Sequence, residues 1–246
     1  MKIHALWCHP RSVSTAFERI MRERGDLDVL HEPFMYDYYL NQSAELFPDF
    51  EPEKGHPTTF AEIRKMILER SEQQPVFFKD MAYYVEDTML KETAFIQQMT
   101  HCFLIRDPAE SILSYHRRDP EFSLTEVGLE AQFTLYQSLI SVGISPLIIT
   151  ADDLREDPQT TLARYWAFAA LPYVEDAFEW DKSVPEGWNS VKDWHAKALS
   201  SGAIQKSELG RDYATELKTL GAPFVDYDRH HRPFYDALRD IANHQK

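Results

Sequence analysis

The sequence predicts an α/β fold: a three-layer, doubly wound and mostly parallel sheet of five strands. Short apolar runs alternate with amphipathic segments along the first two thirds of the chain, which is the pattern of repeated strand–helix units. The runs are almost continuously apolar, as in parallel strands covered on both faces. Beyond residue 172 the alternation breaks up. We therefore expect one domain over residues 1–246, with a core of about 1–172 and a helical or irregular C-terminal cap of about 173–246.

The predicted elements follow one another as strand and helix. Apolar runs predict strands at 3–8, 27–30, 75–79, 101–105 and 146–150. Apolar residues at helical spacing predict helices at 16–24, 59–71, 86–99, 124–143, near 208–220 and near 233–243. In the first helix, Phe17 and Ile20 belong to the apolar face, which leaves Glu18 on the largely opposite, polar side.

Net charge and composition limit the kinds of binding partner that we expect. The 246 residues carry a net charge of −14, so repulsion opposes both nucleic acid and an anionic membrane surface. No run approaches the roughly 20 apolar residues of a membrane helix. The chain enters its first predicted strand without a basic, then apolar leader, and we expect a cytoplasmic protein. Cys8 and Cys102 fall in predicted strands, where buried free thiols are expected. The residues leave the oligomeric state open, with a homo-oligomer among the outcomes.

The loop between the first strand and the first helix concentrates anion-binding groups. It reads HPRSVST, residues 9–15. The first turn of the helix offers unpaired backbone N–H groups and a positive dipole end. Arg11 adds a forked cation, and Ser12, Ser14 and Thr15 add hydroxyls. The glycine-rich Walker A pattern is absent. An ordinary helix start, capped by Ser12 or Ser14, is the alternative.

This loop resembles the 5′-phosphosulfate loop of sulfotransferases that use 3′-phosphoadenosine 5′-phosphosulfate (PAPS), whose usual form is PRSGTT or PKSGTT. The resemblance implies that Arg11, Ser12, Val13, Ser14 and Thr15 bind this co-substrate. Val13 stands where the family has glycine. A β-branched residue disfavours the positive φ that glycine permits.

Two later segments resemble the same family. FLIRDPAESILSYHRR, residues 103–118, places Arg106 at the end of a strand and Ser114 eight residues later. That spacing is similar to the family's 3′-phosphate-binding segment, which implies the same role for these two residues. Residues 147–172 resemble a structural segment that follows the last core strand. The resemblance covers about residues 3–172 and implies the P-loop-like sulfotransferase architecture.

The residue that acts as general base is less clearly indicated by the sequence. Many relatives carry Lys-Thr-His after the third strand, whereas this chain has Lys79, Asp80 and Met81, and methionine cannot take a proton. Other members place a glutamate after the second strand, where this chain has Glu32. The resemblance thus implies Glu32 as the base, with His31 and Asp80 in reserve. Arg11 and Lys79 oppose the charge that develops on the transferred group.

The implied reaction moves a sulfuryl group from PAPS to a hydroxyl or amine of a small-molecule acceptor, by in-line displacement that requires no metal. Two alternatives stay open. A phosphotransferase or kinase-like enzyme would hold magnesium through Asp80 and the hydroxyl of Ser14 or Thr15. A nucleotide-binding module without catalysis is favoured by the absent histidine and by Val13.

Two further features allow competing interpretations. The aromatic stretch 34–56 is either an acceptor-binding lid or a segment whose rings pack onto the domain. Late in the chain, acidic and histidine side chains cluster beside Arg229 and Arg232, which oppose a cation, so we expect no metal there. The members of this cluster are Asp226, Asp228, His230 and His231.

Overall fold

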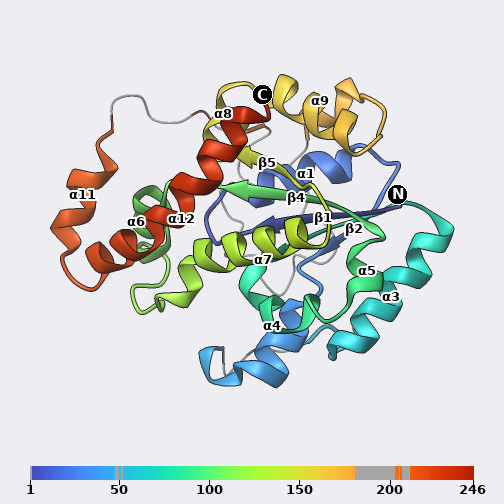
Figure 1. Cartoon of the computed structure of the whole chain (residues 1–246), viewed down its shortest axis with the longest axis horizontal. Coiled ribbons are helices and arrows are strands. Elements are labelled where there is room, and N and C mark those ends of the chain that lie inside the picture. Colours follow the sequence, from blue (N-terminus) through green and yellow to red (C-terminus); the bar gives the residue numbers. More distant parts are fainter. Residues whose placement is uncertain (1, 48–49, 51, 181–202, 205, 207–210) are drawn as a thin grey trace.

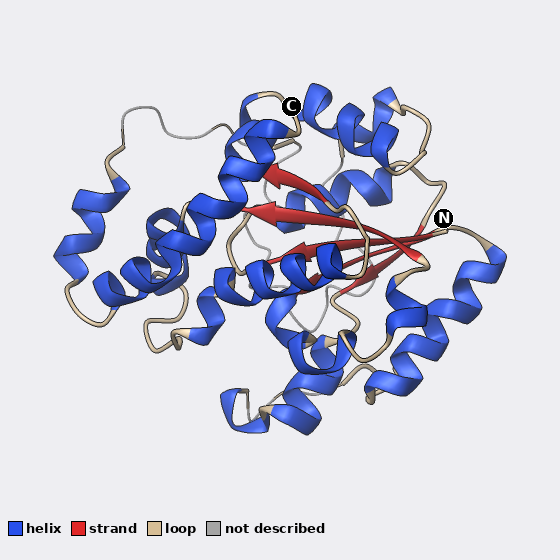
Figure 2. Ribbon diagram, viewed as in Figure 1, coloured by secondary structure: helices blue, strands red, loops and turns tan. Residues whose placement is uncertain are grey.

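All five predicted strands are present and form one sheet. The computed structural model describes residues 2–47, 50, 52–180, 203–204, 206 and 211–246. The strands are β1 (Ile3–Cys8), β2 (Asp28–His31), β3 (Val76–Met81), β4 (Met99–Ile105) and β5 (Leu147–Thr150). Their order is β2-β3-β1-β4-β5, and every neighbouring pair is parallel. Figure 2 shows the arrows running in one direction. The predicted α/β class is confirmed, and the sheet is wholly parallel.

Helices cover both faces of the sheet. In Figure 1, α7 (Leu129–Ser141) and α12 (Phe224–His244) lie in front of the strands and α1 (Ser14–Glu23) lies behind them. The other α-helices are α2 (Met35–Asp37), α3 (Phe60–Gln73), α4 (Glu86–Met89), α5 (Thr93–Ile96), α6 (Pro108–His116), α8 (Ala151–Glu156), α9 (Pro158–Phe168) and α11 (Tyr213–Leu220). Both faces of β1 are therefore buried, which explains its continuous apolar sequence.

Several predicted helices differ from those observed. The single helix expected at 86–99 is two short helices, α4 and α5, and residues 99–100 already belong to β4. The helix expected at 124–143 is interrupted at Gly128, whose φ of 78° ends a 3-10 turn before α7 begins. A β-carbon on Gly128 would lie 3.0 Å from Cβ of His9. The spacing of apolar residues cannot reveal this contact between distant parts of the chain. The contact explains why the helix is interrupted at Gly128.

The C-terminal cap packs directly on the core. The helix expected near 233–243 begins earlier, at Phe224, and contains Pro233 in its interior. It contacts α6, α7 and β5, so tertiary packing outweighs the lost backbone hydrogen bond. Of the helix expected near 208–220, only α11 lies among the described residues. No helix in the described ranges combines the length and apolar content needed to cross a bilayer.

The strand order places a switch in chain direction at the central strand. β1 lies between β3 and β4, and the chain first builds the β2–β3 side of β1 before crossing to β4 and β5. In open parallel sheets, ligands bind beyond the carboxyl ends of the strands at such a switch in direction. The loops that follow β1 and β4 meet at this position.

Candidate active site

The loop after β1 enters α1 through a strained backbone. Val13 is the N-cap of α1 with φ 72°, and no side chain caps the helix. The alternative of a helix start capped by Ser12 or Ser14 is therefore wrong. Arg11 also has a positive φ, 64°, and each such non-glycine residue costs about 1–3 kcal/mol. The Ser12 hydroxyl is buried and has no hydrogen-bond partner among the described residues. A strained loop with an unpaired hydroxyl is typical of a ligand-binding turn.

The loop is tied to the segment that follows β4. Arg11 Nε donates to Ser114 Oγ at 3.1 Å. The Arg106 guanidinium donates to the backbone carbonyl of Arg11, and the Arg106 amide donates to His9 Nε2 at 3.0 Å. The structure thus brings together the residues that sequence motifs assigned separately to the 5′ and 3′ ends of one nucleotide.

Arg106 has an acidic partner that the sequence analysis did not name. Its guanidinium pairs with Glu110, one turn along α6, and Arg155 Nη1 lies 2.8 Å from the same carboxylate oxygen. Burial opposes ionisation of Glu110, but the two arginines outweigh it and bring its pKa to about 2. A phosphate bound by Arg106 must therefore share this cation with an ionised carboxylate.

The local field of the site is positive although the chain is acidic. Burial, and then the neighbouring cations Arg106 and Arg118, lower the pKa of the Arg11 guanidinium. Crowded cations of this kind are stabilised by an anion. Arg117 and Arg118 are exposed on the surface. The site can therefore attract an anionic ligand despite the net charge of −14.

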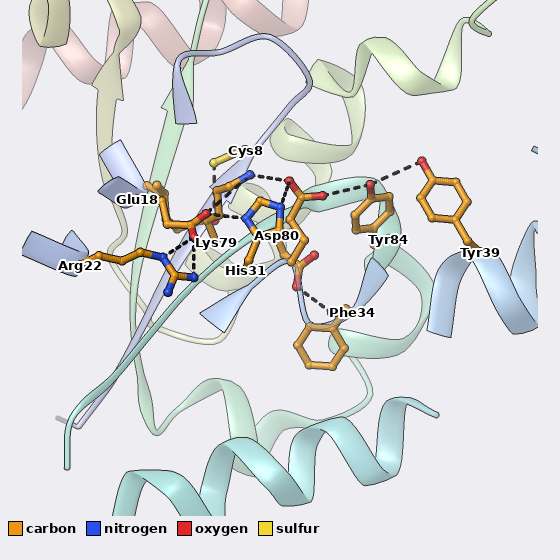
Figure 3. Close-up of polar contacts among 11 residues, drawn as sticks. Cys8, Glu18, Arg22, His31, Phe34, Tyr39, Lys79, Asp80 and Tyr84 are labelled. Atoms are coloured by element: carbon orange, nitrogen blue, oxygen red, sulfur yellow. Dashed lines mark hydrogen bonds and ion pairs between the residues drawn. The ribbon is translucent and has the colours of Figure 1, made fainter. Parts of the chain in front are cut away.

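A buried cluster of charges lies at the ends of β2 and β3 (Figure 3). His31 and Lys79 are register partners on these strands, so their side chains share one face of the sheet. Lys79 Nζ contacts Oε1 of Glu32, the residue after β2, and lies 3.9 Å from Oε2 of Glu18. The charges are nearly fully buried, at 1% exposure for Lys79 and 6% for Glu32.

The two main partners of this cluster reinforce each other's charged forms. Burial would raise the pKa of Glu32, but Lys79 and then His31 outweigh it and lower that pKa. Burial would lower the pKa of Lys79, but Glu32 and Glu18 raise it above its ordinary value. Glu32 is consequently an anion at neutral pH, as a base must be, and its φ of 42° adds a third strained backbone at this edge.

The reserve candidates have different surroundings. His31 Nδ1 lies 2.6 Å from Oε2 of Glu18, and its Nε2 lies 3.7 Å from Oε1 of Glu32. Asp80 accepts a 2.9 Å hydrogen bond from the Phe34 amide, and burial raises its pKa well above the ordinary value. Burial thus disfavours the ionised form of Asp80, which is the form in which a carboxylate accepts a proton or binds magnesium.

Glu18 is the residue that sequence reasoning placed wrongly. It was expected on the polar side of the first helix, yet its exposure is 0%. His31 and Lys79 approach it from the sheet, and Arg22 Nη2 contacts its Oε1 at 2.8 Å. Helical periodicity sorts residues by polarity alone, so it cannot recognise a carboxylate buried against charges from distant strands. The spacing of Glu18 and Arg22, four residues apart, was the only local signal.

Aromatic side chains adjoin Glu32. The Tyr84 hydroxyl lies 3.4 Å from Glu32 Oε2 and 3.4 Å from the Tyr39 hydroxyl. Tyr38 and Phe50 are buried, and their rings contact neighbouring rings. Packing onto the domain thus accounts for much of the 34–56 stretch, and an acceptor-binding role for it stays a prediction.

The late acidic and histidine cluster is engaged in structural contacts. Arg232 pairs with Asp107, the N-cap of α6, and with Asp228. His231 is buried, and its Nε2 lies 2.9 Å from the Leu124 carbonyl. Within the described part of the chain, no three histidine, cysteine or acidic side chains come together as a metal site. Cys8 and Cys102 are buried free thiols, as expected.

Comparisons with known proteins agree with this architecture. A family model described as a sulfotransferase domain matches residues 1–239. The sulfotransferase domain from the curacin biosynthetic pathway superposes with a TM-score of 0.60 at 18% identity, covering 93% of this chain and 95% of that chain. The sulfotransferase domain from the Synechococcus PCC 7002 olefin synthase superposes with a TM-score of 0.57 at 15% identity, covering 93% of each chain. These structures share the fold.

Two relatives from Arabidopsis thaliana carry a different name. The chain is 27% identical over 248 residues to branched-chain-amino-acid aminotransferase-like protein 2 and 25% identical to the corresponding protein 1. The alignments cover 99% and 98% of this chain. They span 42% of the length of each relative.

Proposed function

The chain belongs to the sulfotransferase domain family, and we propose that it transfers a sulfuryl group from PAPS to a hydroxyl or amine of a small-molecule acceptor. The observation that carries the proposal is the junction of the two phosphate-binding segments. Arg11 Nε donates to Ser114 Oγ at 3.1 Å, and Arg106 donates to the Arg11 carbonyl. This junction follows the carboxyl ends of β1 and β4, at the switch in chain direction, where open parallel sheets bind ligands.

The loop after β1 binds the 5′-phosphosulfate end in this proposal. The first backbone N–H groups of α1, the unpaired Ser12 hydroxyl and the hydroxyls of Ser14 and Thr15 supply donors, and Arg11 supplies charge. The 3′-phosphate lies against Arg106 and Ser114. Recognition of both ends distinguishes PAPS from nucleotides that lack a 3′-phosphate.

Glu32 removes the acceptor proton. The acceptor oxygen or nitrogen forms a bond to sulfur, the bond between sulfur and the bridging phosphate oxygen breaks, and 3′-phosphoadenosine 5′-phosphate (PAP) leaves. In the free protein Lys79 is neutralised by its contact with Glu32. Once Glu32 holds the proton, its share of this neutralisation ends, so more of the charge of Lys79 acts on the departing phosphate, while Glu18 remains 3.9 Å from Lys79 Nζ. Proton transfer and leaving-group stabilisation are thereby coupled.

The phosphotransferase alternative depends on Asp80 as a magnesium ligand. Carboxylates bind magnesium in their ionised form, whereas burial raises the pKa of Asp80 well above its ordinary value. This observation favours sulfuryl transfer over phosphoryl transfer. The Arabidopsis relatives are named after an aminotransferase. This chain spans only 42% of the length of each of them, so that name carries no aminotransferase activity over to this chain.

The decisive experiment supplies PAPS labelled with ³⁵S, a panel of phenols, alcohols and amines, and the purified chain, with and without magnesium. We expect a labelled product and release of PAP without magnesium. Phosphoryl transfer from ATP that requires magnesium would instead establish the phosphotransferase. Tight binding of PAP without turnover on any acceptor would favour the nucleotide-binding module.

The variant Glu32→Gln tests the base, because it keeps the shape of the side chain and removes its basicity. Turnover should fall about 10²- to 10⁴-fold while the affinity for PAP stays within about twofold. Glu23→Gln is the matched control, since Glu23 is a glutamate of the neighbouring helix α1 that pairs with Arg19. Loss of PAP binding in Glu32→Gln would reassign Glu32 to the scaffold.

A further inference from the structure

Glu18 is a fully buried carboxylate that the proposed reaction leaves without a role. Its exposure is 0%, and three cations or donors surround it. His31 Nδ1 lies 2.6 Å from Oε2, Arg22 Nη2 lies 2.8 Å from Oε1, and Lys79 Nζ lies 3.9 Å from Oε2. These neighbours hold the pKa of Glu18 far below its ordinary value against the effect of burial. A buried charge is costly unless paired, so its position requires an explanation.

The location of Glu18 connects three elements of the site. It lies on α1, the helix that begins at the anion-binding loop. His31 ends β2, and its register partner Lys79 lies on β3. The carboxylate of Glu18 therefore contacts one residue on each strand: His31, which precedes Glu32, on β2 and Lys79 on β3. Figure 3 shows these side chains converging from the helix and the two strands.

The contact with Glu18 determines which nitrogen of His31 carries a proton. An ionised carboxylate only accepts hydrogen bonds, so His31 Nδ1 holds the hydrogen that it donates to Glu18. The other ring nitrogen, Nε2, is directed toward Glu32 Oε1 at 3.7 Å. Glu18 therefore favours the tautomer of His31 that carries hydrogen on Nδ1 and helps to orient the ring beside Glu32.

The contact with Lys79 sets the electrostatics of Glu32. The groups facing Glu32 are Lys79 and Asp80 from β3, His31 from β2, Tyr84 from the turn after β3 and Glu18 from α1. Lys79 is shared between two carboxylates. If Glu18 were neutral, the full charge of Lys79 would act on Glu32 and weaken it as a base. After Glu32 has taken a proton, Glu18 is the carboxylate that still holds Lys79.

We propose that Glu18 is a positioning residue: it fixes His31 and Lys79 on either side of Glu32 and keeps Lys79 in place when Glu32 is protonated. This inference rests on the proposed function. It adds a residue of α1 to the machinery of proton transfer. Anion binding at the start of α1 and proton transfer at the ends of β2 and β3 then share one rigid helix.

The test compares Glu18→Gln with Glu23→Gln, which changes the same residue type on the same helix away from the cluster. We expect kcat to fall on the order of 10- to 100-fold in Glu18→Gln, with the affinity for PAP within about twofold of wild type. Glu23→Gln should match wild type in both. Glu18→Asp keeps the charge and shortens the side chain, so it should retain more activity than Glu18→Gln.

A second measurement does not depend on turnover. Nitrogen-15 spectra of the histidine rings report the tautomer of His31, assigned with His31→Gln. We expect Nδ1 of His31 to carry hydrogen in wild type and in Glu23→Gln, as its contact with Glu18 requires, and this preference to be weakened in Glu18→Gln. If Glu18→Gln does not fold, Glu18→Asp supplies both readouts, with a reduced kcat at constant PAP affinity.

The outcomes separate the two proposals. A wild-type chain that sulfates no acceptor overturns the proposed function itself. An active wild type, together with a folded Glu18→Gln variant of unchanged kcat or unchanged His31 tautomer, overturns the positioning role alone. A parallel loss of PAP affinity and kcat also overturns it, because Glu18 would then support the whole site as a scaffold.

Discussion

Arg11 and Ser114 are hydrogen-bonded at 3.1 Å across 103 residues of sequence. One belongs to the turn after the central strand and the other to α6, so this bond joins the two segments that would hold opposite ends of a nucleotide. A change at either residue is expected to alter both ends of the site. The binding predictions below follow from this junction.

Replacing Arg11 with Ala should weaken PAP binding about 10- to 150-fold. A charge-assisted contact contributes about 1.5 to 3 kcal/mol, and no other residue of the 9–15 loop carries a fixed positive charge. Isothermal titration calorimetry gives the affinity. Arg117→Ala is the control, because Arg117 is exposed after α6 and should change affinity less than about threefold. Equal losses in both variants would contradict a specific role for Arg11.

Replacing Arg106 with Ala should abolish the preference for a 3′-phosphate. We expect PAP to bind about 10- to 150-fold more weakly, while adenosine 5′-phosphate changes by less than about threefold. Ser114→Ala should cost a smaller factor, about 2- to 13-fold, because its hydroxyl is neutral. The measurement is the ratio of the two affinities in each variant. A wild type without preference for PAP would argue against the assignment.

Replacing Gly128 with Ala should destabilise the protein through a clash with the loop. The new β-carbon would lie 3.0 Å from Cβ of His9, at a φ of 78°. Gly143→Ala is a matched control, since its φ is 81° and no atom lies within 4 Å. Backbone strain alone should cost the control about 1–2 kcal/mol. Urea denaturation should show a larger loss for Gly128→Ala, and equal losses would refute the close contact.

Acidification should destabilise the fold through buried neutral histidines. Trp7 Nε1 donates to His101 Nδ1 at 2.9 Å, so Nδ1 must be unprotonated. Burial lowers the pKa of His101 to about 4, below the value of about 6.5 expected in an unfolded chain. Its contribution to stability is complete above pH 6.5 and is lost as the pH falls toward 4. At pH 5 the loss is about 2 kcal/mol.

His101→Gln checks this titration. The amide of glutamine offers an acceptor to Trp7 and a donor to the Ile96 carbonyl, which lies 2.8 Å from His101 Nε2. The fall in unfolding free energy between pH 7.5 and pH 5 should therefore be about 2 kcal/mol smaller in the variant. Burial also lowers the pKa values of His4 and His231 to about 4. These two histidines should therefore account for part of the pH dependence of stability that remains in the variant. An identical slope in wild type and variant would contradict the titration of His101.

The strands were predictable because their signal is local. A run such as IHALWC at 3–8 is apolar on both faces, and only burial in a parallel sheet suits it. The break at Gly128 was not predictable, because the spacing of apolar residues continues through it. That break depends on the approach of His9, which lies more than a hundred residues earlier in the sequence.

The contact between the two candidate segments involves motifs that are written in consecutive residues. The loop at 9–15 and the pair Arg106 and Ser114 are local motifs, and the fold brings them into contact. The pairing of Lys79 with Glu32 and the burial of Glu18 depend on strand register and helix rotation. Neither quantity can be read from residue order, which is why Glu18 was expected on the polar side of the first helix and the pairing of Lys79 with Glu32 was not predicted.

The central position of β1 sets conditions on biosynthesis. β1 leaves the ribosome before the other four strands of the sheet, yet its two neighbours, β3 and β4, come from residues 76–81 and 99–105. Until residue 105 has emerged, the apolar run 3–8 has at least one unpaired edge, which can associate with other chains. Closing these long connections slows folding relative to a fold built from local contacts. During synthesis, β1 must therefore stay protected from other chains until β3 and β4 have emerged.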